Sequence, residues 1–274
     1  INILLLGQGD KDHDGIDLTD TIMVASIDPK HTQSVVLLSL PRDLQMTTEY
    51  FGERSVISGR KINSLYRDIK SNIRYRTGVS GKEASLQALL EMRTEIGRIV
   101  NLDIHHVIKV NFTAFTEAVD TLGGVDIEVP YDIVDTTYPD ENYGYEPFII
   151  RKGPQHLDGA TALKYARSRH TTSDFGRSAR QQQVLHAMGQ KAKAIGLLTD
   201  TSKLMNLWQT YADHVETTMH IGELLSLAAI GRQINRDHLI TMQLSNINGL
   251  YGSRVEPGGL LYNPPREEFD GASV

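Results

Sequence analysis

The feature that most constrains the fold is a set of three short apolar runs near the start of the chain, at residues 1–6, 21–27 and 34–40. Each run is continuously apolar rather than alternating and is bounded by Gly, Asp or Pro, which is typical of strands that are covered on both faces. The Asp28-Pro29 pair between the second and third runs is a turn signal. We therefore expect these two strands to form an antiparallel hairpin.

Helical and extended patterns alternate along the rest of the chain. Residues 131–147 are rich in Asp, Tyr, Pro and Asn without periodicity, and we interpret them as an exposed loop before a short strand at 148–151. Helices are predicted at 82–100, 112–122, 158–166, 176–196, 201–214 and 220–234, and strands at 105–110, 125–129 and 239–244. Because no repeat or clear linker divides the chain, we predict a single α/β domain over residues 1–250, followed by a partly irregular tail over 251–274.

Composition narrows the possible functions. The 274 residues are 40% apolar, enough for a sizeable core, and the net charge of −6 gives no general attraction for nucleic acid. The absence of Cys excludes thiolate catalysis and disulfides. No apolar run approaches the roughly 20 residues that span a bilayer, and the chain opens at Ile1 directly into an apolar run, so we interpret it as trimmed of upstream sequence.

A dense acidic segment follows the first apolar run. Its carboxylates, all within residues 10–20, are Asp10, Asp12, Asp14, Asp17 and Asp20. The opening resembles a calcium-binding loop, but Thr21 stands where a bidentate Glu is required. Two interpretations stay open, a solvated turn and a Mg²⁺ site that uses one or two of these carboxylates together with substrate phosphates.

Arginines form the second candidate site. Arg42 follows the third apolar run, where ligands of α/β proteins often bind, although an Arg beside Asp43 is also compatible with a surface ion pair. Four more arginines lie within 14 residues: Arg167, Arg169, Arg177 and Arg180.

The spacing of these arginines determines which of them can point in the same direction. Arg167 and Arg169 point the same way only if the chain has left the helix, because two helical residues differ by about 200°. Arg177 and Gln181 are four residues apart, so they lie one above the other at the start of a helix that Asp174 could cap. Guanidinium groups beside a helix N-terminus suit phosphate or pyrophosphate, whereas the alternative is a solvated basic helix face.

Several motifs in order resemble the LytR-CpsA-Psr family. They are INILLLG, LTDTIMVASIDP, VVLLSLPRDL, KIN at Lys61 to Asn63, FTEAVDTLGGVDIEVP, GPQHLDGATALKYARSRH and DFGRSARQQ. The resemblance implies a twisted mixed β-sheet sandwiched by helices, with an apolar pocket for a polyprenyl tail. It also implies a membrane-anchored phosphotransferase on the extracytoplasmic face that attaches glycopolymers to peptidoglycan or another surface acceptor.

The resemblance also implies roles for residues. Pyrophosphate-binding positions fall on Arg42, Lys61, Arg167, Arg169, Arg177 and Gln181. A Mg²⁺ ion, or Mn²⁺, would be held by Asp20 and by an acid near the end of the first strand, where this chain departs from the common Gly-x-Asp pattern. Asp10 is our first choice there, with Asp14 as the alternative.

The mechanism expected from this resemblance is attack by an acceptor hydroxyl on the sugar-linked phosphorus of a polyprenyl-pyrophosphate glycan. Arg42, Arg167 and Arg169 would stabilise the developing charge, and Asp174 is a candidate proton acceptor. Two other functions stay open, a pyrophosphatase in which water replaces the acceptor and a non-catalytic module that binds a lipid-linked glycan.

Overall fold

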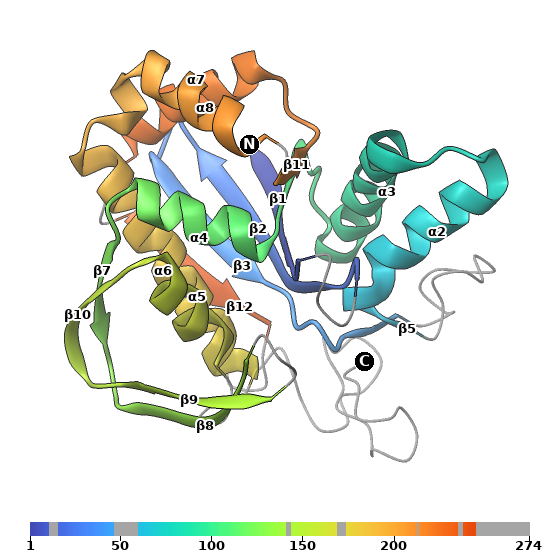
Figure 1. The fold of residues 1–274 in the computed structure, drawn as a ribbon. Helices are drawn as coiled ribbons and strands as arrows, with labels where there is room; N and C mark the ends of the chain where they lie inside the picture. Colours follow the sequence, from blue (N-terminus) through green and yellow to red (C-terminus); the bar gives the residue numbers. More distant parts are fainter. Residues whose placement is uncertain are drawn as a thin grey trace, which may run out of the picture.

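The computed structural model describes residues 1–10, 16–46, 60–140, 144–168, 174–212, 214–234 and 238–244. Its centre is a six-stranded mixed sheet in the order β11-β6-β1-β2-β3-β12 (Figure 1). The strands are β1 (Asn2–Gln8), β2 (Thr19–Asp28), β3 (Ser34–Ser39), β6 (His106–Val110), β11 (Val215–Thr217) and β12 (Leu239–Gln243). The predicted α/β class and mixed sheet are confirmed.

The first three strands form an antiparallel meander, in which β2 and β3 make the predicted hairpin. Two strands from later in the chain extend it in parallel: β6 pairs with β1, and β12 pairs with β3. The edge strand β11 runs antiparallel to β6.

Helices cover both faces of the sheet (Figure 1). Leu4 and Leu6 of β1 pack into a core with α2 (Leu65–Thr77) and α3 (Gly81–Val100), whereas Ile3 faces the core that contains residues of α6 (Asp174–Ala194) and α8 (Ile221–Gln233). Successive side chains of a strand point to opposite faces, so a continuously apolar run buries both. The prediction of strands covered on both faces is confirmed. The helix α2 was not predicted.

A second layer holds two short sheets beside α4 (Phe112–Thr121), α5 (Gly159–Arg167) and α6. They are the pair β7 (Val125–Val129) with β10 (Gly153–Leu157) and the pair β8 (Ile133–Pro139) with β9 (Tyr145–Ile150). Ile133 and Tyr138 of β8 are buried in this layer's core.

The interpretation of residues 131–147 as a loop was therefore wrong, because β8 and the start of β9 lie there. The inward side chains of β8 include Asp135, which is 2% exposed and accepts a hydrogen bond from Ser168. A buried carboxylate within the inward face interrupts the apolar alternation by which a strand is recognised.

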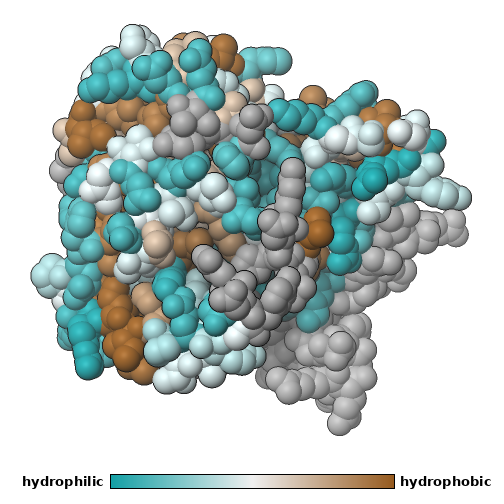
Figure 2. All heavy atoms as spheres, viewed as in Figure 1, coloured by the Kyte–Doolittle hydropathy of each residue, from teal (hydrophilic) through white to brown (hydrophobic). Residues whose placement is uncertain are grey.

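The remaining elements are the pair β4 (Gln45–Met46) and β5 (Arg60–Lys61), the 3-10 turns η1 (Ile62–Ser64) and η2 (Leu197–Thr199), and α7 (Thr201–Tyr211). In the described parts of the chain, no helix combines the length and apolar character needed to cross a bilayer. Polar side chains cover much of the face seen in Figure 2, with apolar side chains between them.

Candidate functional site

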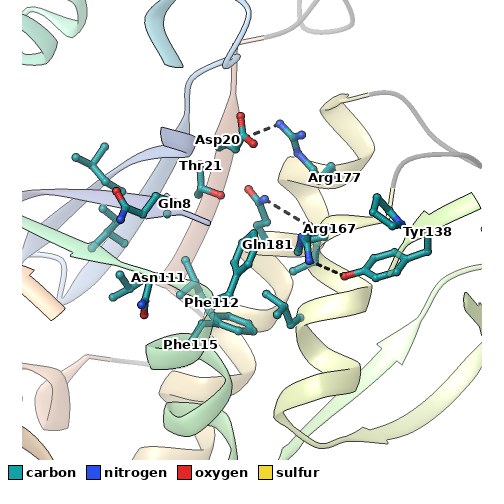
Figure 3. Close-up of a pocket in the computed structure, with 18 of the residues that line it drawn as sticks. Gln8, Asp20, Thr21, Asn111, Phe112, Phe115, Tyr138, Arg167, Arg177 and Gln181 are labelled. Carbon is teal, nitrogen blue, oxygen red and sulfur yellow. Dashed lines mark hydrogen bonds between the residues drawn. The ribbon is translucent and has the colours of Figure 1, made fainter. Parts of the chain in front are cut away.

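A pocket of about 410 Å³ opens between the central sheet and the second layer. Most of its wall is apolar. Its apolar side chains include Leu5 of β1, Phe112 and Phe115 of α4, Leu163 of α5 and Leu185 of α6. Its polar side chains include Gln8, Asp20, Arg167, Arg177 and Gln181 (Figure 3). The pocket is therefore amphiphilic.

Arg167, the last residue of α5, is held in the pocket wall by two aromatic rings. Its guanidinium carbon lies 4.1 Å from the ring centre of Phe112 and 5.4 Å from that of Tyr138, and Nη1 donates to the Tyr138 hydroxyl at 3.0 Å (Figure 3). Burial raises the pKa of Tyr138, although the charge of Arg167 opposes this shift. The rings fix the plane of the guanidinium, which suits bidentate binding of an oxyanion.

The chain leaves the helix directly after Arg167. Ser168 has non-helical backbone angles (φ −54°, ψ 140°), which is the condition under which Arg167 and Arg169 can point the same way. Arg180 of α6 secures this end of α5: its Nε donates to the Tyr165 carbonyl oxygen at 2.8 Å and its Nη2 to that of Ser168. Arg180 is thus a structural C-terminal cap of α5, not a pocket residue.

Arg177 and Gln181 both line the pocket from α6, as their spacing of four residues predicts. Arg177 is 4% exposed, and its Nη2 donates to the backbone oxygen of Asp20 at 3.3 Å. Gln181 Nε2 donates to the Ala166 carbonyl oxygen at 3.4 Å, so α6 is joined to both β2 and α5 at the pocket (Figure 3).

A β-bulge places Asp20. Gly7 of β1 pairs with Thr21, but the next residue, Gln8, pairs with Thr19, which leaves Asp20 as the extra residue on β2. Its backbone oxygen is therefore available to Arg177, and its carboxylate Oδ1 accepts from Arg42 Nη1 at 2.9 Å.

Arg42 connects Asp20 to a short series of ion pairs. Its Nε lies 3.6 Å from Asp43 Oδ2, and Lys61 Nζ lies 3.2 Å from Asp43 Oδ1. Arg42 lies with Arg177 beside a smaller hollow next to the main pocket. The structure thus brings Arg42, Arg177 and Asp20 together, while Lys61 joins them through Asp43.

Asp10 occupies a different place from Asp20. Its carboxylate accepts from the Thr113 backbone nitrogen at 3.3 Å and from the Thr113 hydroxyl at 3.2 Å, at the N-terminus of α4, and it is not part of the pocket wall. Asp14, Arg169 and the side chain of Asp174 lie outside the described residues.

A Mg²⁺ ion fits the pocket only in part. Among the described residues, no group of three or more His, Asp or Glu side chains could hold a metal. The pocket lining includes two carboxylate residues, Asp20 and the buried Asp135, and Asp135 Oδ2 already accepts a hydrogen bond from the Ser168 hydroxyl. Mg²⁺ is often bound by one or two carboxylates plus substrate phosphates, so Asp20 is compatible with such an ion.

Most residues of the pocket lining were not predicted from the sequence, among them Phe112, Tyr138 and Gln8. Phe112 and Tyr138 hold Arg167, and Gln8 lies at the bulge. Phe112 follows a helix N-cap and Gln8 lies just beyond an apolar run, and neither context signals a ligand site. Tyr138 lies in the segment that was interpreted as a loop.

Comparison with known proteins decides the family. The sequence model of the LytR_cpsA_psr family matches residues 1–270. The chain belongs to the LytR-CpsA-Psr family. Its motifs, read in order, had predicted this membership, which is now confirmed.

Relatives of this LytR-CpsA-Psr chain include two proteins named polyisoprenyl-teichoic acid–peptidoglycan teichoic acid transferase. TagV of Bacillus subtilis is 27% identical over 90% of this chain and 56% of its own length. TagU of Oceanobacillus iheyensis is 28% identical over 92% of this chain and 70% of its own length. The chain thus spans little more than half of TagV.

Solved structures share the fold. The crystal structure of B. subtilis TagV is 25% identical with a TM-score of 0.64, covering 96% of this chain and 89% of that one. A structure described as TagT bound to LIIa-WTA has the same TM-score at 22% identity, covering 96% and 83%. The twisted mixed sheet sandwiched by helices is therefore the LytR-CpsA-Psr fold.

Proposed function

We propose that this LytR-CpsA-Psr domain transfers a glycopolymer phosphate from a polyprenyl-pyrophosphate carrier to a hydroxyl of peptidoglycan or another surface acceptor. The observation that carries the proposal is a single pocket with an apolar wall and a cationic part. Leu163 and Leu185 suit a polyprenyl chain, and Arg167 and Arg177 suit a pyrophosphate. The names of TagV and TagU, both teichoic acid transferases, support the same chemistry.

In the proposed reaction, the acceptor hydroxyl oxygen attacks the sugar-linked phosphorus. A new phosphorus–oxygen bond forms as the bond from this phosphorus to the bridging oxygen breaks, and polyprenyl phosphate leaves with the electron pair. The hydroxyl proton passes to a base, for which Asp174 remains the candidate. The product is a phosphodiester between the glycan and the acceptor.

The arginines would act by electrostatic stabilisation. Arg167 is held between Phe112 and Tyr138 and would meet the phosphate oxygens without a change of orientation, so little reorganisation is needed as charge develops. Arg177 would contribute a second guanidinium from α6, and Arg42 and Lys61 would add positive charge near Asp20. Arg169 is proposed on the family resemblance alone.

Mg²⁺, or Mn²⁺, is proposed as the cofactor. Asp20 would hold the ion from the pocket wall. Asp10 is proposed as the second ligand on the family resemblance alone, since its carboxylate accepts hydrogen bonds from Thr113 outside that wall. When bound, a divalent cation neutralises charge on phosphate oxygens. In this proposal the domain works at the extracytoplasmic face of the cell membrane, attached by an N-terminal anchor, and has no nucleic-acid partner.

The test is a transfer assay with a synthetic polyprenyl-pyrophosphate sugar and Mg²⁺. Mass spectrometry measures the release of polyprenyl phosphate, which we expect to depend on added peptidoglycan. We expect Arg167→Ala to lower the rate of release at least about 100-fold, which is the effect of removing one such electrostatic donor. Arg151→Ala is the matched control, because Arg151 is 72% exposed and pairs with Asp132.

Two results would contradict the proposal. Equal release with and without peptidoglycan, with free glycan phosphate as the product, would identify a hydrolase. Binding of the lipid-linked sugar without any turnover in the presence of Mg²⁺ and acceptor would identify a binding module.

A further inference from the structure

Gln8 is a pocket residue whose side chain is oriented by a hydrogen bond from Lys109, a residue outside the pocket wall. It ends β1 at the bulge and lines the pocket, and Figure 3 shows it across the cavity from Arg167 and Tyr138, with Thr21 between. Its side-chain oxygen Oε1 accepts a hydrogen bond from Lys109 Nζ at 2.9 Å.

Lys109 is a buried cation on the neighbouring strand β6. Its side chain is 2% exposed, and Nζ lies 3.2 Å from Glu216 Oε2 of β11 and 4.2 Å from the ring centre of Tyr66 of α2. The Tyr66 hydroxyl donates to the same Glu216 oxygen at 3.1 Å. Tyr66 of α2 and Glu216 of β11 therefore hold the ammonium group in one position.

This arrangement determines which end of the Gln8 amide is available. An ammonium group has only donors, so it can bind the amide only through Oε1, and the opposite end of the amide is the NH₂ group. Gln8 thus presents donors, and no charge, to a ligand in the pocket. Since the positive charge of Lys109 is paired with Glu216, this part of the wall suits an uncharged oxygen rather than a phosphate.

We propose that Gln8 determines specificity by donating a hydrogen bond to a hydroxyl or carbonyl oxygen of the glycan end of the substrate, and that Lys109 is the residue that positions its amide. The inference rests on the proposed function, in which the arginines bind the pyrophosphate. A site built to donate to a substrate oxygen discriminates strongly against a ligand that lacks it.

A purely structural role for Lys109 is the competing explanation. Lys109 is buried but its partner Glu216 is 39% exposed, and burying an ammonium group carries a desolvation penalty that an ion pair often does not outweigh. Stability alone therefore gives little reason for a lysine here. The contact with Gln8 connects this pair to the pocket wall, and only the positioning role predicts an effect on ligand discrimination.

The test compares two probes, a sugar-bearing polyprenyl pyrophosphate and the same lipid pyrophosphate without sugar. Gln8→Met keeps the length of the side chain and removes both donors. We expect the preference for the sugar-bearing probe, measured by calorimetry, to fall about tenfold to a hundredfold, while affinity for the sugar-free probe stays within about twofold. Gln190→Met is the control, because Gln190 is exposed near the C-terminal end of α6.

The role of Lys109 is tested with Lys109→Met combined with Glu216→Gln, which avoids leaving a charge without its partner. We expect the preference to fall in this variant as well, and adding Gln8→Met to lower it no further, because the two changes act through one hydrogen bond. Independent, additive losses would overturn the positioning role.

The outcomes separate this inference from the function on which it rests. If wild-type protein binds both probes and Gln8→Met leaves the preference unchanged, the inference is overturned and the proposed function stands. If wild-type protein binds neither probe, the proposed function fails and the inference fails with it.

Discussion

Three adjacent glutamines on α6 have three different partners. Gln181 lines the pocket, Gln182 is buried and donates to the Leu37 and Met242 carbonyl oxygens of β3 and β12, and Gln183 accepts from the Tyr165 hydroxyl. Each step along a helix turns the side chain by about 100°, so neighbours face different surroundings. One of the three therefore belongs to the candidate site, and the other two stabilise the fold around it.

Asp28 allows a prediction about pH. At the end of β2 its carboxylate accepts from the backbone nitrogens of Lys30, His31 and Thr32 and from the Thr32 hydroxyl, and these bonds lower its pKa well below the usual value. The ionised form is favoured in the folded state, so its contribution to stability is present above about pH 4, the ordinary pKa of Asp, and is lost as the pH falls through the lower folded-state pKa.

We therefore expect Asp28→Ala to lower the melting temperature at pH 7 and to lower it less at pH 3, measured by circular dichroism. Asp103→Ala is the control, because Asp103 is exposed and the hydrogen bond from Asn2 Nδ2 is accepted by its backbone oxygen, which the substitution keeps. A melting-temperature difference for Asp28→Ala that grows on acidification would contradict the assignment.

The arginine cluster shows how far residue types predict a site. Arg167, Arg177 and Gln181 line one pocket as their spacing suggested, and Asp20 joins them. Arg180 has the same side chain as Arg177 but binds carbonyl oxygens at the end of α5. The sequence could not separate the two roles, because the difference depends on which face of α6 meets the pocket.

At the scale of elements, the site depends on a junction between α5 and the strand β8. Tyr138 reaches Arg167 from β8, and Asp135 accepts from Ser168 just beyond the helix. The helical periodicity of the sequence predicted α5. The strand β8 was not predicted, because its inward side chain Asp135 is polar, and only the hydrogen bond from Ser168 at the end of α5 explains why a carboxylate is buried there. The helices and the apolar strands were predictable, whereas the contacts that orient Arg167 were not.

The turn from α4 to β7 supplies a prediction about elements. Gly123 and Gly124 both have positive φ, but a Cβ on Gly123 meets nothing within 4 Å, whereas one on Gly124 would lie 2.5 Å from His156 Nε2 and 2.9 Å from the Leu157 carbonyl oxygen. We expect Gly123→Ala to lower the free energy of unfolding by about 1–2 kcal/mol through backbone strain alone.

Gly124→Ala should cost about 2 kcal/mol more, because overpacking against β10 adds to the same strain. Urea denaturation of the two variants checks this order, and Gly123→Ala is the built-in control. Equal losses of unfolding free energy in the two variants would show that β7 and β10 move apart without an energetic cost.

At the scale of the whole molecule, the pocket lies where the two layers meet. The sheet contributes Leu5, and the second layer contributes Phe115, Leu163 and Leu185, so neither layer encloses the pocket alone. Its arginines come from α5 and α6, and its two carboxylate residues, Asp20 and Asp135, from β2 and β8. Ligand binding in this region would therefore connect the two layers.

Filling the apolar part of the pocket should separate lipid binding from anion binding. We expect Leu163→Trp to weaken binding of a long-chain polyprenyl pyrophosphate at least about tenfold, the effect of losing roughly 1.4 kcal/mol of apolar contact, and to leave inorganic pyrophosphate binding within about twofold. Calorimetry measures both affinities. Leu86→Trp on α3 is the control, since Leu86 is 45% exposed and is not part of the pocket wall. Unchanged binding of the long-chain ligand would place its tail elsewhere.

The pairing of β12 with β3 has a consequence for biosynthesis. Residues 239–243 lie beside residues 35–39, so the outer edge of the central sheet is completed by a segment about 200 positions later in the chain. The meander of β1, β2 and β3 can form as soon as it leaves the ribosome, but the edge of β3 stays open until almost the whole domain has been synthesised. An unpaired apolar edge attracts other strands, so the nascent chain is most prone to aggregate in the interval before β12 arrives.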